Sequence, residues 1–295
     1  MAVYNREIIK HITDDENYKR LEDIIAKETK EFYALPWKAR WLDFEKKVKT
    51  QEYAEAVLAK AKEDTDLFLG AGYAADIPSL ELKRRMTIKD YHLNSNINLF
   101  SLSLIAAGLF ILYNDAKTGN GDTSVAGTIP AAAGMAGGIV HFARKVKQNS
   151  PAYIPEEQKI ICVTGKESEV YCDMAHEYSH AVFMRSISDR KECMFANEGF
   201  AEGVSTCLSK KENIKTGLFN SVYLLVTARN QVQKKCLKNP YEPVVEKLHT
   251  GEEIDYWGEM IMRSTGYAAF RLAEEKYGAN VYREFIRGNT GILLE

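Results

Sequence analysis

The stretch His176-Glu177-Tyr178-Ser179-His180 governs how this sequence is interpreted. On a helix of 3.6 residues per turn, side chains four residues apart lie about 40° apart on one face. The imidazoles of His176 and His180 can therefore reach a single metal ion. Glu177 lies beside that face, where its carboxylate can take a proton from a water molecule on the ion without being a ligand. The stretch predicts a helical metal site for hydrolysis.

A short β-prone run and several helical patterns surround this stretch. The run Lys-Ile-Ile-Cys-Val at 159–163 is typical of a strand and ends at the turn pair Thr164-Gly165. Helices are expected at 168–184, 197–208, 217–237 and 253–277, and the last of them ends at Gly278. The predicted fold class is therefore mainly α with a small β-sheet (α+β).

A second motif, Asn-Glu-Gly-Phe-Ala at 197–201, follows the histidine pair. Together the two motifs resemble those of the gluzincin zinc metallopeptidases, especially the aminopeptidase-type branch. The resemblance implies that His176, His180 and Glu198 hold Zn²⁺ and that Glu177 is the catalytic general base. The exopeptidase signature Gly-x-Met-Glu-Asn does not occur in the chain, so amino-terminal specificity is not implied.

Two further side chains lie on the faces that carry the expected ligands. Glu202 is four residues after Glu198, and it is our candidate for the acceptor that binds the second ring nitrogen of a metal-bound histidine. The alternative for Glu202 is a solvated surface carboxylate. Cys172 is four residues before His176, and we expect it to be a buried structural thiol.

The sequence does not identify the residue that would stabilise the oxyanion. Gluzincins resemble one another in using a tyrosine or histidine of a later helix for this purpose. Tyr256 and Tyr267 are both eligible here, and the chain has 16 tyrosines. The remaining histidines are isolated in the sequence and are expected to have ordinary roles: His11, His92, His141 and His249.

Residues 1–95 are predicted to form a helical N-terminal region. The region is rich in charge, and its apolar residues recur at helical spacing. The expected breaks are Pro36, Gly70 and Gly72. Apolar sets that define the pattern include Leu21, Ile24, Ile25 and Phe32, and then Trp41, Phe44 and Val48.

Residues 96–142 form a second part, predicted to be an apolar helical hairpin. Uncharged runs at 97–113 and 123–140 flank a polar loop, and each approaches the length that a bilayer-spanning helix needs. The flanking basic residues lie outside the hairpin, which predicts that both soluble parts face the cytoplasm. These flanking residues are Lys83, Arg84, Arg85 and Lys89 before it and Arg144, Lys145 and Lys147 after it, against Lys117 in the loop.

A pair of buried helices in a soluble core is the alternative for this hairpin. Pro130 and several glycines between 119 and 138 weaken the second run as a membrane span. The expected location is therefore the cytoplasmic side of a membrane, with the protein integral through residues 97–140, or the cytoplasm itself.

The charge and composition of the chain restrict the classes of partner that we expect. With 39 basic and 41 acidic residues the net charge is −2, so no overall positive field for nucleic-acid binding is expected. Five cysteines without a Cys-x-x-Cys pair favour a reducing compartment, and the first ten residues lack the apolar core of a secretory signal. The expected partners are a peptide or protein substrate and the lipid bilayer.

The third part, residues 150–295, is the expected gluzincin-like zinc hydrolase domain, and the resemblance covers about 155–290 of it. The leading functional hypothesis is a zinc metallopeptidase that hydrolyses peptide bonds through a zinc-bound water, with Glu177 as general base. The alternatives are a hydrolase of another amide, a degenerate zinc-binding protein associated with a membrane, and a scaffold in which the histidine pair is fortuitous. Measurement of the zinc content distinguishes the scaffold hypothesis, which predicts no bound zinc, from the other hypotheses.

Overall fold

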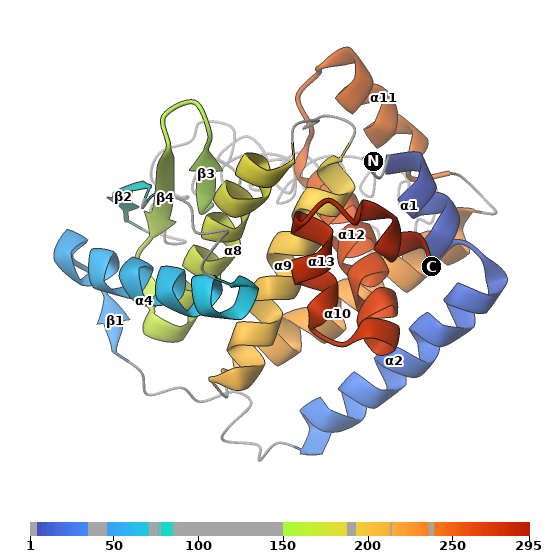
Figure 1. Cartoon of the computed structure of the whole chain (residues 1–295), viewed down its shortest axis with the longest axis horizontal. Helices are drawn as coiled ribbons and strands as arrows, with labels where there is room; N and C mark the ends of the chain where they lie inside the picture. Colours follow the sequence, from blue (N-terminus) through green and yellow to red (C-terminus); the bar gives the residue numbers. More distant parts are fainter. Residues whose placement is uncertain are drawn as a thin grey trace, which may run out of the picture. The chain divides into compact units, whose positions relative to one another are not determined.

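The computed structural model describes residues 5–34, 46–70, 76, 78–84, 150–187, 193–212, 214–235 and 239–295. It is mainly helical with a small β-sheet, which confirms the expected fold class (Figure 1). By its contacts the chain divides into residues 1–84 with 151–295 and residues 85–150, and all the elements described below belong to the first unit. The predicted hairpin at 97–140 lies outside the described residues. Among the described helices, none combines the length and apolar composition that a membrane crossing needs.

The elements follow one another along the chain in the order shown in Figure 1. They are α1 (Asn5–Ile12), α2 (Asp15–Ala34), β1 (Lys47–Val48), α4 (Gln51–Leu69), β2 (Ser79–Lys83), β3 (Ala152–Ile154), β4 (Lys159–Val163), β5 (Gly165–Lys166), α8 (Glu167–Ser186), α9 (Met194–Lys211), α10 (Lys215–Lys235), α11 (Glu242–Thr250), α12 (Tyr256–Tyr277), α13 (Asn280–Ile286) and the 3₁₀ helix Thr290–Leu294. The expected strand at 159–163 is β4, and the four expected helices correspond to α8, α9, α10 and α12.

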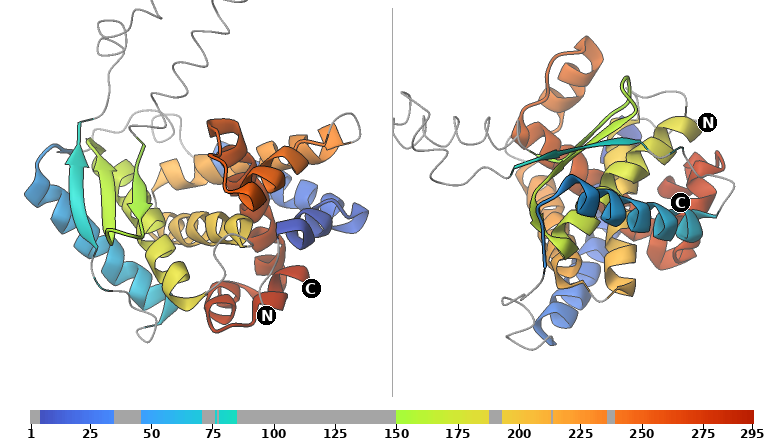
Figure 2. Two further views of the ribbon diagram at one scale, coloured as in Figure 1. Left: turned by 90° about the horizontal axis from the view of Figure 1, so that it is seen from above. Right: turned by 90° about the vertical axis from the view of Figure 1, so that its left-hand side faces the viewer.

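The three-stranded sheet has the order β2-β4-β3 (Figure 2). β2 runs parallel to β4, with Ser79 opposite Lys159, whereas β3 runs antiparallel to it, with Ala152 opposite Ile161. β3 is therefore an edge strand of this sheet. β1 and β5 form a separate antiparallel pair.

Two strands lie in the N-terminal region that was expected to be helical, and this expectation was wrong for them. In β2 the sequence Ser-Leu-Glu-Leu-Lys alternates polar and apolar residues, which is the strand period of two. Val48, expected on a helical face, is buried in β1. These short strands depend on partners that are distant in the sequence, so local helical spacing does not reveal them.

α9 lies between α8 and α12 at the centre of the unit (Figures 1 and 2). Aromatic rings from all of these helices and from α13 pack together there, and each of them is at most 1% exposed. Full burial of each such ring contributes roughly 1.5–3 kcal/mol. The cluster consists of Phe183, Phe200, Phe270, Tyr282 and Phe285.

Glycines permit the close crossing of α9 and α12. A Cβ added at Gly266 would lie 1.8 Å from the carbonyl oxygen of Phe195, and one added at Gly199 would lie 2.2 Å from the carbonyl carbon of Gly266. Because these neighbours are backbone atoms, no side-chain rotation could make room. The two glycines therefore set the distance between the helix that carries Glu198 and α12.

Candidate metal centre

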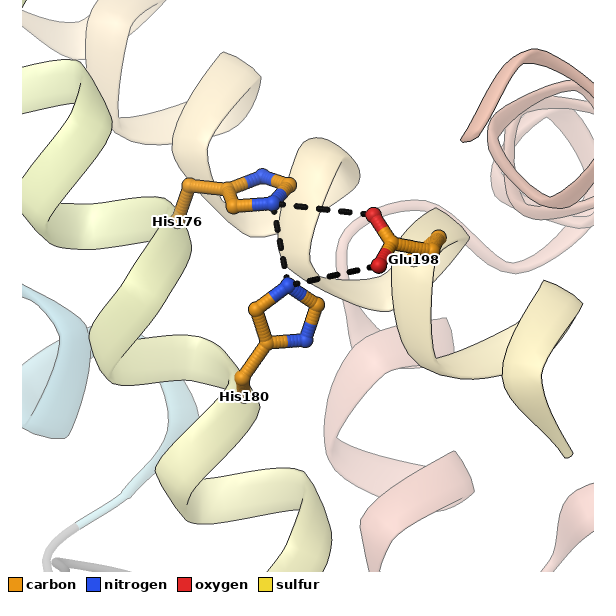
Figure 3. A group of neighbouring side chains, drawn as sticks. All are labelled: His176, His180 and Glu198. Carbon is orange, nitrogen blue, oxygen red and sulfur yellow. Dashed lines mark hydrogen bonds and ion pairs between the residues drawn. The ribbon is translucent and has the colours of Figure 1, made fainter. Parts of the chain in front are cut away.

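The three expected ligands lie together in the described part of the chain (Figure 3). His176 and His180 project from α8, and Glu198 faces them from α9. The two Nε2 atoms are 3.0 Å apart, and each is 3.8 Å from one carboxylate oxygen of Glu198. One ligand atom from each residue lies within 4.8 Å of the others. Ligands of a tetrahedral zinc ion are separated by about 3.4 Å, so this donor set fits zinc in type and spacing.

The opposite ring nitrogens of both histidines lie near side-chain oxygens. The Nδ1 atom of His180 lies 2.9 Å from Oδ1 of Asn197, and we assign to it the ring proton, which it donates to this acceptor. The Nδ1 atom of His176 lies 3.5 Å from Oε1 of Glu202 and makes no hydrogen bond to the described residues. The Nε2 lone pair of His180 faces Nε2 of His176 across 3.0 Å, and a proton or a cation between the two nitrogens would be held by both. This is the arrangement that a metal ion would stabilise.

Burial holds His176 in the neutral, metal-binding form. Burial is the main cause that lowers the pKa of His176 well below its ordinary value, and His180 and Arg263 act in the same direction. A histidine must be neutral to ligate a metal. The site therefore supplies His176 as a ligand at neutral pH without a proton to displace.

Two tyrosines hold α8 in the rotation that presents the histidines. Tyr171 and Tyr178 are seven residues apart, about two turns, so they lie on one face of the helix. Their hydroxyls donate to Asp64 and Asp66 of α4, each at 2.8 Å. α8 is thus held by hydrogen bonds on one side while its histidines face α9 on another.

Glu177 lies beside the ligands in a buried environment. It is 7% exposed, and its carboxylate accepts a hydrogen bond from the backbone N–H of Tyr153 in the edge strand β3. Burial raises the pKa of Glu177 to about 7; the Glu198 carboxylate acts in the same direction, and His180, Arg263 and this hydrogen bond oppose it. A general base works best when its pKa is close to the operating pH.

Glu202 lies at the centre of a polar cluster behind His176. Its Oε1 atom accepts hydrogen bonds from the Nε and a terminal nitrogen of Arg263, and the Nε contact is 2.7 Å long. Its Oε2 atom accepts from Nδ2 of Asn220 at 3.0 Å. The side chain is only 2% exposed, so it is not a solvated surface carboxylate.

Three residues of this centre were not anticipated from the sequence. Asn197 belongs to the recognised motif, and the motif was the signal that could have marked it as a partner of His180. Arg263 and Asn220 lie on α12 and α10 in no motif, and only the crossing of these helices brings them to Glu202. No local pattern in the sequence could have identified them.

The other candidate side chains contact residues outside the set of three expected ligands. Tyr267 is completely buried, and its hydroxyl lies 2.6 Å from that of Ser221; Tyr256 packs on Trp257. The Cys172 thiol lies 3.0 Å from the Ser209 hydroxyl.

The histidines expected to be ordinary divide into two groups. The Nδ1 atom of His11 lies 3.2 Å from Nδ2 of Asn17, and His249 is exposed on α11. His92 and His141 lie outside the described residues.

Comparison of the chain with family models, with curated proteins and with solved structures gave no match.

Proposed function

We propose that this protein is a zinc-dependent metallopeptidase that hydrolyses peptide bonds. The observation that carries the proposal is the convergence of His176, His180 and Glu198 within 4.8 Å, with Glu177 buried beside them. The donor set of two imidazoles and one carboxylate is one that zinc enzymes use, and it leaves a fourth position open for water or substrate.

The chain supplies the groups that such a reaction needs besides the metal. When bound, zinc would act as a Lewis acid that lowers the pKa of water and polarises the scissile carbonyl. Glu177 would take the proton from the attacking water and pass it to the leaving amine. Asn197 and Glu202 would orient the two histidines, and Arg263 would hold Glu202 in place.

Zinc content and peptide cleavage test this proposal together. The parent protein should contain about one zinc ion per chain and should cleave members of a peptide library. His176→Ala should lose the zinc, whereas Glu177→Gln should keep it and lose hydrolysis by a factor of about 10² to 10⁴. Exposed residues of α11 provide matched controls, His249→Ala and Glu246→Gln, which should leave both properties unchanged.

The possible outcomes separate the competing functions. Zinc binding without peptide cleavage would favour a hydrolase of another amide or a degenerate binding site. Absence of zinc from the parent would leave a scaffold as the better hypothesis. Activity retained by Glu177→Gln would refute the role of this residue as base.

We also propose that residues 97–140 attach the enzyme to a membrane. The uncharged runs of the sequence support this, and so do the described strands that precede and follow this part of the chain. Lys83 lies opposite Val163 and Ala152 opposite Ile161, so the chain leaves β2 and enters β3 towards the same end of the sheet. Across the sheet, these two points are two strand spacings or about 10 Å apart. Two packed helices have a similar separation. The protein should then resist extraction by alkaline carbonate, and recovery in the soluble fraction without detergent would contradict this proposal.

A further inference from the structure

A second buried carboxylate joins the N-terminal helix α2 to the centre of the unit. Glu28 is 1% exposed, and its Oε1 atom accepts hydrogen bonds from Lys210 and Arg271. Its Oε2 atom accepts from the hydroxyl of Ser221, which also lies 2.6 Å from the hydroxyl of Tyr267. One side chain of α2 therefore binds α9, α10 and α12.

The same three helices supply the side chains around His176. In α9, Lys210 is eight residues after Glu202, and in α12, Arg271 is eight residues after Arg263. Eight residues correspond to about two turns, or roughly 12 Å along a helix. The Glu28 cluster and the Glu202 cluster are therefore successive layers of one set of helices.

The two layers are closest on α10. Ser221 binds Glu28, and its neighbour Asn220 donates to Oε2 of Glu202 at 3.0 Å. The other oxygen of Glu202 lies 3.5 Å from Nδ1 of His176. Consecutive residues project about 100° apart on a rigid helix, so any rotation of α10 that displaces Ser221 also displaces Asn220.

We propose that Glu28 is a positioning residue for the metal site. By binding Ser221 it fixes the rotation of α10, so that Asn220 holds Glu202 against His176. Helix α2 of the N-terminal region then contributes to the affinity of the site for the metal. This inference rests on the proposed function, because it assumes that His176 binds zinc.

The electrostatics of the Glu28 cluster suit this role. Burial acts to raise the pKa of Glu28, but Arg271, Lys210 and the hydrogen bond from Ser221 outweigh it and lower the pKa below the ordinary value. Glu28 is therefore ionised at neutral pH, and its bonds to charged donors are of the strong kind. Buried charge-assisted bonds of this type are costly to break, so α2 cannot shift without loss of stability.

The test is zinc affinity measured against a competing chelator, for the parent, Glu28→Gln, Asn220→Ala and the double variant. We expect Asn220→Ala to weaken zinc binding about tenfold and Glu28→Gln about three- to tenfold, at or below the lower end of the loss that follows removal of a direct partner of a ligand. In the Asn220→Ala background, Glu28→Gln should cause no further loss, because the connection to Glu202 is already broken.

Two further variants separate positioning from general loosening. Leu21→Ala creates a cavity in the core face of the same helix, and it should lower the stability of the fold while leaving zinc affinity unchanged. Ser221→Ala breaks the same connection by removal of one oxygen atom, and it replaces Glu28→Gln if that variant does not fold.

Two results would refute the inference. One is equal zinc affinity of the parent and Glu28→Gln, and the other is the same fold loss from Glu28→Gln in both backgrounds. If the parent bound no zinc at all, the proposed function would fail first and this inference would fail with it.

Discussion

The two buried carboxylate clusters of this protein use the same helices but differ in their charge balance. Around Glu28, the carboxylates of Glu28 and Glu274 face the cationic groups of Arg271 and Lys210. Two negative charges thus meet two positive ones. This cluster is neutral by means of its own side chains, as a permanent structural connection should be.

The carboxylate cluster at the candidate metal centre is short of positive charge. Glu177, Glu198 and Glu202 contribute three carboxylates, and Arg263 is the cation that interacts with all of them. Histidine ligands bind metals in the neutral form, so when Glu177 is ionised three negative charges and one positive charge leave an excess of two. One divalent cation would supply the missing charge. Burial is the main cause that raises the pKa of Glu177 to about 7, and the neighbouring Glu198 carboxylate adds to this shift.

The largest effect is expected where α9 and α12 cross, since both clusters depend on this crossing. Gly266→Ala would bring a methyl group into the backbone at Phe195, and overpacking that no rotamer can relieve should cost about 3 kcal/mol or more. Urea unfolding measures this loss. Gly291→Ala, which meets no atom within 4 Å, should change stability by less than about 0.5 kcal/mol. Equal stability of the two variants would show that the helices do not approach as closely as described.

Removal of one carboxylate should affect the two clusters differently, mainly in stability for one and mainly in zinc affinity for the other. Glu28→Gln removes a fully buried carboxylate and leaves Arg271 and Lys210, whose side chains are 13% and 31% exposed, with excess positive charge, so it should lower the stability of the metal-free protein by about 3–5 kcal/mol. Glu202→Gln reduces an existing excess of negative charge, so its cost to the metal-free protein should be smaller. Its main effect should be a loss of about 10- to 100-fold in zinc affinity. Urea unfolding and chelator competition on both variants measure these effects, and identical behaviour of the two would contradict the assigned charge balance.

Zinc itself should stabilise the fold through the centre that lacks positive charge. At free zinc about 100-fold above the dissociation constant, the parent should gain about 2.7 kcal/mol. Thermal unfolding with and without zinc measures the gain, which should vanish in His176→Ala and persist in His249→Ala. A gain that survives in His176→Ala would place the zinc elsewhere.

The smallest effect is a pH dependence confined to the Glu28 cluster. Because the pKa of Glu28 is lowered in the folded state, its ionic contribution is complete above its ordinary pKa of 4.5 and is lost as the pH falls through the folded value. The stability difference between the metal-free parent and Glu28→Gln should therefore be constant above about pH 5 and should shrink below pH 4.5. Urea unfolding from pH 3 to 7 measures it. A difference that grows on acidification would have the wrong sign for a paired carboxylate.

Local spacing in the sequence was enough to predict several elements and the candidate ligands. The four-residue interval between His176 and His180 places them on one face of any helix, and the same interval joins Glu198 to Glu202. The strand at 159–163 was likewise predictable, since a short β-prone run before a turn is itself a local signal.

The packing of helices and strands that are distant in the sequence selects the residues that complete the candidate site. Arg263 and Asn220 reach Glu202 because α10, α9 and α12 pack together, and Tyr153 reaches Glu177 because β3 forms the edge of the sheet. The charge balance of each cluster is also a tertiary property. The physical reason is that periodicity along the chain encodes the face on which a side chain lies, whereas the partner across that face depends on how the helices cross.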